Sequence, residues 1–347
     1  MNTFALDTVR NHHNVIGYTV AAVIVFVLAQ NNPGLFETGI SVLTFSLIAI
    51  PLGLMYGHGG VISICQAAFA AVGGYASAKL TIDYGWSPWA TMVIAMVVPG
   101  VLAFVLSRRI LRLSELALAL TTVAIGQAWA IFAGLAKPLT GGHIGIFGIP
   151  PLPFASDAAG AYIGGAIAVL VVIILYENFV HSARGRALNA IRTDPILASS
   201  TGGDVAAQRA VIFSIAAAVA GLGGWYYAHY VGFIAPDSLS FVQSTAILFM
   251  VVIGGRRSSI GPVVGAVVYI VASDLLPGGD IQGAYFGAML VLVLLVLPDG
   301  AASLPKLVRR GIKRRSDSGP PTPVHASASP VPPSRVDDPT NTELPDA

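Results

Sequence analysis

Two apolar runs, GAYIGGAIAVLVVIILY at 160–176 and VIFSIAAAVAGLGGWYY at 211–227, flank a polar stretch, HSARGRALNAIRTDPILASSTGGDVAAQR, at 181–209. Each run is close to the length of about 20 residues that a helix needs to cross the hydrocarbon core of a bilayer. The stretch between them contains four arginines. Short loops rich in Lys and Arg stay on the cytoplasmic side of a membrane. The sequence therefore predicts two membrane spans joined by a cytoplasmic loop.

The composition extends this prediction to the whole chain. Hydrophobic residues make up 55% of the 347 residues and charged residues only 10%, with a mean hydropathy of +0.75. Soluble proteins carry about 25% charged residues. The fold class is therefore an all-α polytopic membrane protein. A single cysteine, Cys65, excludes an intrachain disulfide and a Cys-based metal site.

The apolar runs predict about ten transmembrane helices, at residues 15–29, 35–56, 61–80, 86–106, 113–135, 160–180, 209–230, 240–254, 260–276 and 282–298. Residues 1–14 then form an N-terminal segment, and residues 15–305 form the transmembrane domain. Residues 306–347 begin with a basic stretch and continue as a Pro-rich tail that we expect to be disordered.

The first run, Val15 to Ala29, allows two interpretations. It is short, and Val27-Leu28-Ala29 could serve as a signal-peptidase site. A retained span is the favoured interpretation, because few positive charges precede the run.

The basic residues fix the expected orientation. With both termini in the cytoplasm, only Lys79 and Lys137 of the 19 basic residues fall outside. A missed or an added span would destroy this separation, so it supports ten spans with cytoplasmic N- and C-termini.

The loop at 181–208 contains the signals of a short helix. Asp194 is suited to cap a helix N-terminus, and Pro195 suits the first helical position. Ile196 and Leu197 follow, and Gly202 marks the expected end. Nothing in the chain is available to cover this apolar turn, so we expect it to dock into a partner protein.

Motifs of catalysis are missing from the sequence, which contains no Walker A loop, H-E-x-x-H or G-x-S-x-G pattern. We expect no catalytic residue, no metal site and no cofactor on this chain. Ionisable residues in the expected spans, such as Glu177, lie near span ends, which argues against an ion-driven transporter. His229 is expected at the membrane surface among aromatic residues.

Several uncharged polar residues fall deep inside the expected spans. They line a path for a zwitterion or small amide, or they hydrogen-bond between helices, and the sequence does not separate the two interpretations. The candidates for the path are Ser63, Gln66, Thr121, Thr122, Gln127 and Gln243.

A set of ordered motifs resembles the LivM-type permease family, the membrane subunits of ABC importers for branched-chain amino acids. The resemblance covers about residues 45–305. Its motifs are Gly60-Val61-Ile62-Ser63-Ile64-Cys65-Gln66, Gly73-Gly74-Tyr75, Thr140-Gly141-Gly142, Gly148-Ile149-Pro150, Gly185-Arg186-Ala187, Ala190-Ile191-Arg192, Ala220-Gly221-Leu222-Gly223-Gly224, Ile253-Gly254-Gly255, Gly261-Pro262 and Gly265-Ala266.

The resemblance implies an ABC-importer permease fold in a bacterial inner membrane. It implies as partners two ATPase subunits that hold ATP and Mg, a second related permease and an extracytoplasmic solute-binding protein, with no nucleic acid. The loop at 181–208 would be the segment that couples to the ATPases. Its expected coupling residues are Arg184, Gly185, Arg186, Ala187, Arg192, Asp194, Ile196, Leu197, Ala198 and Gly202.

The chain departs from the family pattern at several positions. Of the coupling pattern E-A-A-x-x-x-G, only Ala198 and Gly202 match, and Ile196 stands at the acidic position. Other departures are at Cys65, Gln127, His143-Ile144 and Arg257. The exact substrate therefore stays open between small amino acids and relatives such as urea or short amides. An ion-coupled secondary carrier or channel is the alternative from another class.

Overall fold

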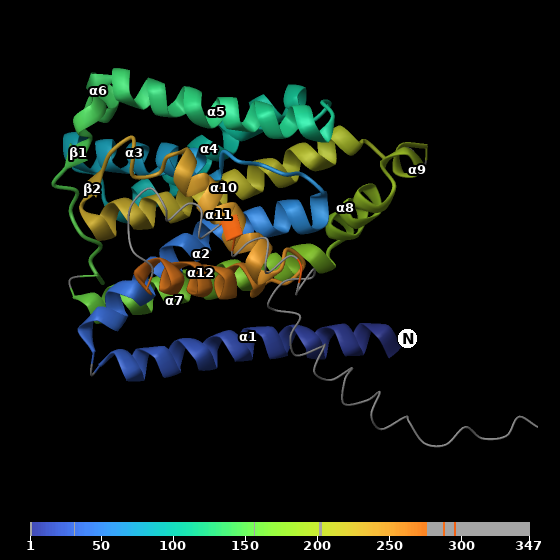
Figure 1. Cartoon of the computed structure of the whole chain (residues 1–347), viewed down its shortest axis with the longest axis horizontal. Coiled ribbons are helices and arrows are strands. Elements are labelled where there is room, and N and C mark those ends of the chain that lie inside the picture. Colours follow the sequence, from blue (N-terminus) through green and yellow to red (C-terminus); the bar gives the residue numbers. More distant parts are fainter. Residues whose placement is uncertain are drawn as a thin grey trace, which may run out of the picture. The chain divides into compact units, whose positions relative to one another are not determined.

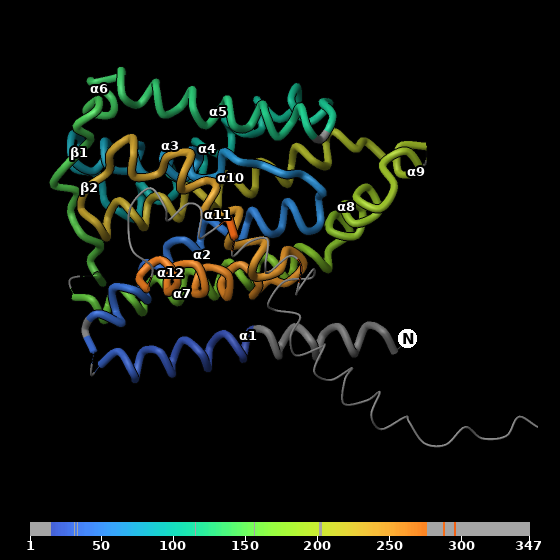
Figure 2. The backbone as a smooth tube through the Cα atoms, viewed as in Figure 1, coloured from blue at the N-terminus to red at the C-terminus, as the bar shows by residue number. Residues whose placement is uncertain are grey.

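The computed structural model describes residues 2–30, 32–155, 157–200 and 203–275, together with 287, 288 and 295 (Figures 1 and 2). The chain divides into a unit at Met1–Pro305, which contains all the described elements, and a second unit at Lys306–Ala347. The elements are α1 (Asn2–Ala29), α2 (Pro33–Gly59), α3 (Gln66–Tyr84), α4 (Pro88–Ile110), α5 (Glu115–Leu135), α6 (Lys137–Thr140), η1 (Gly142–Ile144), β1 (Ile146–Phe147), α7 (Ala158–His181), α8 (Ala183–Thr193), α9 (Pro195–Ser200), α10 (Val205–Val231), β2 (Phe233–Ile234), α11 (Phe241–Gly254) and α12 (Gly261–Leu275).

Nine of the expected spans coincide with helices in this part of the chain, and the expected span at 282–298 lies almost entirely outside it. Among the described residues, α2, α4, α5, α7 and α10 are long and apolar enough to cross a membrane, while α11, α12 and the apolar part of α1 are shorter. The chain is therefore an all-α multi-pass membrane protein.

Helix α10 lies at the centre and packs most extensively against α4, α3 and α2 (Figure 1). Gly221 allows a close approach to α4: a β-carbon there would collide with the carbonyl of Ala95 and lie 2.6 Å from the ring of Pro99, both on α4. On the facing helix α3, a β-carbon at Gly73 would lie 2.6 Å from the Gly221 Cα. Small residues let backbones approach where lipid provides no hydrophobic force between helices. The Gly- and Ala-rich sequence of α10 thus builds the core.

Helix α3 begins five residues later than the sequence predicts, because residues 61–65 are not helical. Gly60 ends α2 with a left-handed backbone, φ 66°. The chain then runs back along the bundle before α3 starts at Gln66 (Figure 2). Val61, Ile62 and Ile64 continue the apolar run, so hydropathy alone does not reveal the interruption. We call residues 60–65 the α2–α3 break.

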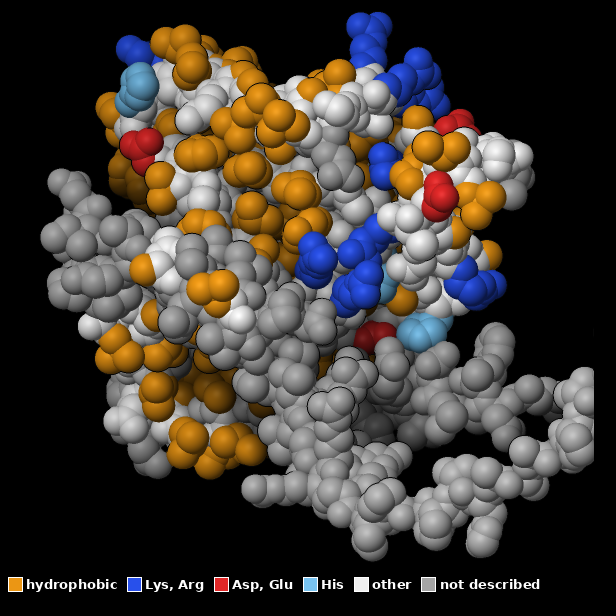
Figure 3. Space-filling view, turned by 45° about the vertical axis from the view of Figure 1, so that its right-hand side comes forward, with side chains coloured by type: hydrophobic (Ala, Val, Ile, Leu, Met, Phe, Trp, Pro, Cys, Tyr) orange, Lys and Arg blue, Asp and Glu red, His pale blue; other side chains and the backbone are white. Residues whose placement is uncertain are grey.

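The described arginine side chains gather at one end of the bundle, where most of the blue side chains lie, on the right-hand side of Figure 3. We call this the basic end. There the Gly57 backbone lies against that of Arg256, and Gly60 lies against the Arg192 side chain. The described arginines of the basic end are Arg108, Arg109, Arg112, Arg184, Arg186, Arg192, Arg209, Arg256 and Arg257.

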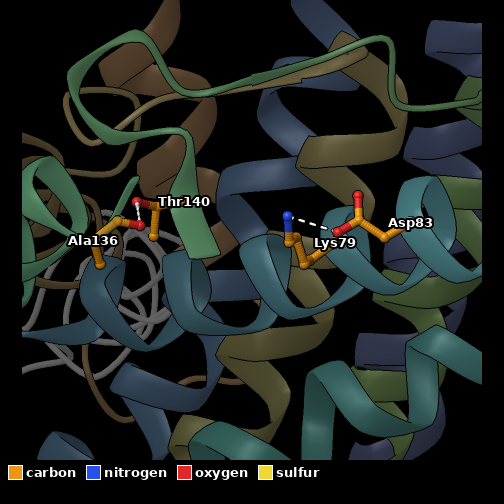
Figure 4. Close-up of polar contacts among 4 residues, drawn as sticks. All are labelled: Lys79, Asp83, Ala136 and Thr140. Carbon is orange, nitrogen blue, oxygen red and sulfur yellow. Dashed lines mark hydrogen bonds and ion pairs between the residues drawn. The ribbon is translucent and has the colours of Figure 1, made fainter. Parts of the chain in front are cut away.

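The opposite end carries the two short strands, which pair antiparallel with Phe147 opposite Phe233. Lys79, one of the two lysines expected outside, forms an ion pair of 2.6 Å with Asp83 one turn further along α3 (Figure 4). Thr140 donates to the Ala136 carbonyl at 2.9 Å and so closes α6 (Figure 4). Local bonds within α3 and at α6 thus stabilise this end.

Helix α1 is attached to α7 by two reciprocal hydrogen bonds. The Tyr18 hydroxyl donates to the Ala166 carbonyl at 3.0 Å, and the Tyr162 hydroxyl donates to the Ala22 carbonyl at 3.1 Å. These bonds attach the apolar part of α1 to the bundle, and retention of Val15 to Ala29 stays a prediction.

Substituting Gly221 tests the central packing. Gly221→Val places a branched side chain against the backbone of α4, and overpacking of this kind costs about 1–3 kcal/mol or more. We expect a clear decrease in the melting temperature of the purified protein in detergent. Gly17→Val is the control, because no atom of the described residues lies within 4 Å of a β-carbon there. Equal melting temperatures for the two variants would contradict this account of the core.

Candidate functional site

The expected coupling segment folds into two helices, α8 and α9, of which the sequence predicted only the second. The Ser182 hydroxyl caps α8 by accepting from the Gly185 N–H at 3.2 Å. One face of α8 is buried against the bundle through Gly185, Leu188 and Ile191. Helix α8 is thus packed firmly on the bundle at the basic end, and we call this helix the platform.

The platform carries the expected basic coupling residues on its outer side. Arg184 is exposed, and Arg186 reaches back so that its Nη1 donates to the His181 carbonyl at 2.7 Å. Ala187 and Arg192 are half-buried. Partial burial lowers the pKa of Arg192, and the positive charges of Arg257 and Arg256 lower it further. These charges lie close enough to repel one another, so the surface is suited to an anionic partner.

Helix α9 projects from the platform (Figure 1), and its apolar residues are exposed. The Asp194 Oδ1 accepts from the N–H groups of Ile196 at 3.0 Å and Leu197 at 2.9 Å, which is the predicted N-cap. Ile196 is 80% exposed and Leu197 62% exposed, while Ala198 is half-buried. The expected stop at Gly202 lies outside the described residues.

Three of the expected path residues meet at the α2–α3 break. The Thr122 hydroxyl, from α5, accepts from the Ile64 N–H at 3.1 Å, and Ser63 lies 3.3 Å from the Cys65 sulfur. Gln66 donates through Nε2 to the Ala216 carbonyl of α10 at 2.9 Å. Non-helical backbone at membrane depth persists only where protein or water provides hydrogen-bond partners. Thr122 and Gln66 thus form bonds between helices, whereas Ser63 bonds within the break itself.

The other path candidates are distributed around this cluster. Thr121 donates to the Ala117 carbonyl in its own helix at 2.7 Å. Gln127 is exposed on α5, and Gln243 is half-buried on α11. Next to Gln243, the Ser244 hydroxyl accepts from the Ala67 N–H at 3.2 Å, in the first turn of α3. These three candidates thus belong to two helices, α5 and α11, that approach the start of α3.

The sequence interpretation of His229 is wrong. Its side chain is 1% exposed, with Nε2 2.8 Å from the Ser77 hydroxyl and Nδ1 2.8 Å from the Pro150 carbonyl. The Trp225 and Tyr226 side chains beside it are also buried. The neighbouring aromatic residues suggested a position at the membrane surface. In the structure, the His229 side chain instead faces Ser77 of α3.

Sequence reasoning also missed a polar cluster at the base of α8. His58, Tyr176 and Asn189 come together from α2, α7 and α8. Nearby, the Ser259 hydroxyl donates to the Glu177 carboxylate, so this acid is bound inside the protein and is more than an interfacial anchor. The only available signal was that these polar residues flank the ends of apolar runs.

The fold and this site define a class: a multi-pass membrane protein that exposes an apolar helix at its basic end. Residues 34–298 match the family described as branched-chain amino acid transport system / permease component. The chain belongs to this family, and the resemblance to LivM-type permeases is confirmed.

Named relatives agree with this assignment. The high-affinity branched-chain amino acid transport system permease protein LivM of Escherichia coli (strain K12) is 27% identical over 311 residues, which is 80% of this chain and 73% of the relative. The LivH permease protein of the same organism is 27% identical over 290 residues, 76% of this chain and 92% of the relative. A probable LivM of Methanocaldococcus jannaschii is 23% identical over 247 residues, 65% of this chain and 72% of the relative. No solved structure matches the chain significantly.

Removing the cap tests whether α9 depends on it. Asp194→Ala removes the acceptor for two N–H groups and should destabilise α9 by about 1 kcal/mol. We expect hydrogen exchange of the amides at 195–200 to become several-fold faster, measured by mass spectrometry. The control is Asp157→Ala, because Asp157 precedes α7 without a side-chain cap bond. Exchange in the first turn of α7 should not change. Unchanged exchange at 195–200 in Asp194→Ala would show that packing alone holds α9.

Proposed function

We propose that this chain is a membrane-spanning permease subunit of an ATP-driven ABC importer for branched-chain or other small amino acids. The observation that carries the proposal is α9, a capped helix that exposes Ile196 and Leu197 beside a cluster of arginines. An apolar helix with a basic surround suits a groove on a partner with acidic rims. That partner is a pair of ATPase subunits, which bind ATP and Mg; the chemistry of hydrolysis takes place there.

The orientation follows from the charges. Ten spans with both termini in the cytoplasm of a bacterial inner membrane put the basic end in the cytoplasm, where ATP is available. Helices α2 and α4 then run inward and α3 and α10 outward. The domain boundaries follow: residues 1–14 and 306–347 are cytoplasmic segments around the permease domain at 15–305.

Helix α5 supports a second permease subunit as partner. Only 22% of its most apolar stretch is buried, against 78% in α2. Gln127 is exposed in the middle of this helix, between the exposed Leu120 and Ile131. An amide facing lipid is costly. We therefore place a related permease, or the water-filled path between the two permeases, against this face. A solute-binding protein would dock at the opposite end, around the paired strands.

The path would run past the α2–α3 break. Ser63, Gln66 and Thr122 lie there, with Thr121, Gln127 and Gln243 around them. Their uncharged donors and acceptors suit a zwitterion, which brings both charges itself. Urea and short amides fit the same chemistry. Transport would be alternating access, in which the spans rock about this site when the ATPases move α9.

The proposal is tested by uptake into vesicles that contain the chain, two ATPases, a second permease and a binding protein encoded beside it. Labelled leucine, isoleucine, valine and urea are compared with and without ATP. Uptake should require ATP. It should fall at least about ten-fold in Ile196→Asp plus Leu197→Asp, because a buried apolar side chain contributes about 1.5–3 kcal/mol to the docking of α9.

Leu113→Asp is the matched control, since Leu113 is also apolar and exposed at the basic end, 43%, but on the α4–α5 turn. It should keep ATP-dependent uptake. Uptake by this chain alone, driven by an ion gradient and indifferent to the α9 substitutions, would favour a secondary carrier and would contradict the proposal.

A further inference from the structure

His58 connects three helices at the basic end. It lies in the last turn of α2, with Nδ1 3.0 Å from the Asn189 Oδ1 of α8 and Nε2 3.2 Å from the Tyr176 hydroxyl of α7. The His58 and Tyr176 rings pack edge to face, with centroids 5.8 Å apart. Tyr176 is buried, and His58 and Asn189 are half-buried. The imidazole is therefore held on two sides.

Each of the two hydrogen bonds of the His58 ring has one donor and one acceptor. The Asn189 carbonyl oxygen only accepts, so the His58 Nδ1 carries a proton and donates to it. The Nε2 of the neutral ring then accepts from the Tyr176 hydroxyl. A leucine of similar size would leave both partners without these bonds, and unmade bonds of buried polar groups are costly.

The position of His58 is significant for what it joins. On one side, Asn189 belongs to α8, which leads through Asp194 directly into α9. On the other side, His58 is two residues before Gly60, where the α2–α3 break begins. A β-carbon at Gly60 would lie 3.3 Å from Arg192 of α8, so the two segments are also packed together. His58 thus lies between the element that would meet the ATPase and the start of the path.

Neighbouring bonds tie the α11–α12 turn to the same helices. The Arg256 Nη1 donates to the Tyr56 hydroxyl at 2.7 Å, and Ser259 donates to Glu177. These bonds join α2 and α7 to the turn at 255–259. The His58–Asn189 bond instead joins α2 to α8.

We propose that His58 is a positioning residue that transmits movement of α8 and α9 to the α2–α3 break. This inference rests on the proposed function, because it assumes that ATPases move α9. It adds a specific consequence: loss of the His58 link uncouples ATP hydrolysis from uptake while the ATPases remain bound.

The experiment compares variants in the reconstituted complex of this chain with its ATPases, second permease and binding protein. His58→Leu removes both hydrogen bonds, and His58→Asn keeps a donor near the position of Nδ1. Tyr162→Phe is the matched control, because it removes one hydrogen bond, to the Ala22 carbonyl, between α7 and α1. Co-purification of the ATPases, ATP hydrolysis and leucine uptake are measured for each variant.

We expect His58→Leu to retain the ATPases and hydrolyse ATP while uptake per ATP falls about five-fold or more, the lower end of coupling between two sites. His58→Asn should recover part of this ratio, and Tyr162→Phe should keep the ratio of the wild type. If His58→Leu assembles poorly, Asn189→Leu, which removes the same bond from the α8 side, should show the same loss of the ratio with the ATPases bound.

An unchanged ratio in both His58→Leu and Asn189→Leu would overturn the inference. A loss of ATPase binding, hydrolysis and uptake in equal proportion in both variants would also overturn it, because that is the result of a purely structural role. Failure of the wild-type complex to show ATP-dependent uptake is a different outcome, which would overturn the proposed function itself.

Discussion

The structure depends on one constraint of the bilayer: backbone groups that leave a helix inside the membrane need partners from the protein or from trapped water. At the α2–α3 break the chain leaves helical structure over residues 60–65, and hydroxyls take over part of the bonding. Thr122 accepts from Ile64, and Ser63 accepts from the Cys65 N–H at 3.5 Å. Side chains that look like candidates for substrate contact therefore also hold the break in place. Ser63, Gln66 and Thr122 are almost completely buried, so the structure shows their structural role, and their contact with a substrate stays a prediction.

The packing of the other helices fixes the position of this break relative to the basic end. Close packing of α10 on α3 and α4, made possible by Gly221 and Gly73, forms a rigid centre. Helix α8 packs on the bundle through Gly185, Leu188 and Ile191, while no residue of α9 is buried. Packing is thus closest around α10 and least close at α9. The parts of a protein that move in a conformational change come from its less firmly packed regions, so α9 is suited to move.

Much of the architecture could be predicted from sequence, because membrane spans depend on length and hydropathy. The N-cap at Asp194 was also readable, since Asp-Pro before an apolar turn is a local signal. The α2–α3 break was not, because Val61, Ile62 and Ile64 are as apolar as a span. The amphipathic α8 and the links of His58 and His229 depend on which helices meet. A single sequence does not show which helices contact one another, so these features could not be predicted from it.

The central claim is that ATP hydrolysis acts through α9 on the α2–α3 break. The chain offers a native reporter, since Cys65 is its single cysteine and is fully buried in the break. The most direct measurement is the rate at which a maleimide labels Cys65 in the assembled complex, followed by mass spectrometry of its peptide. The account predicts faster labelling during ATP turnover than at rest, and no such increase when Ile196 and Leu197 are replaced by aspartate. Labelling that is the same with and without ATP in the active wild-type complex would contradict it.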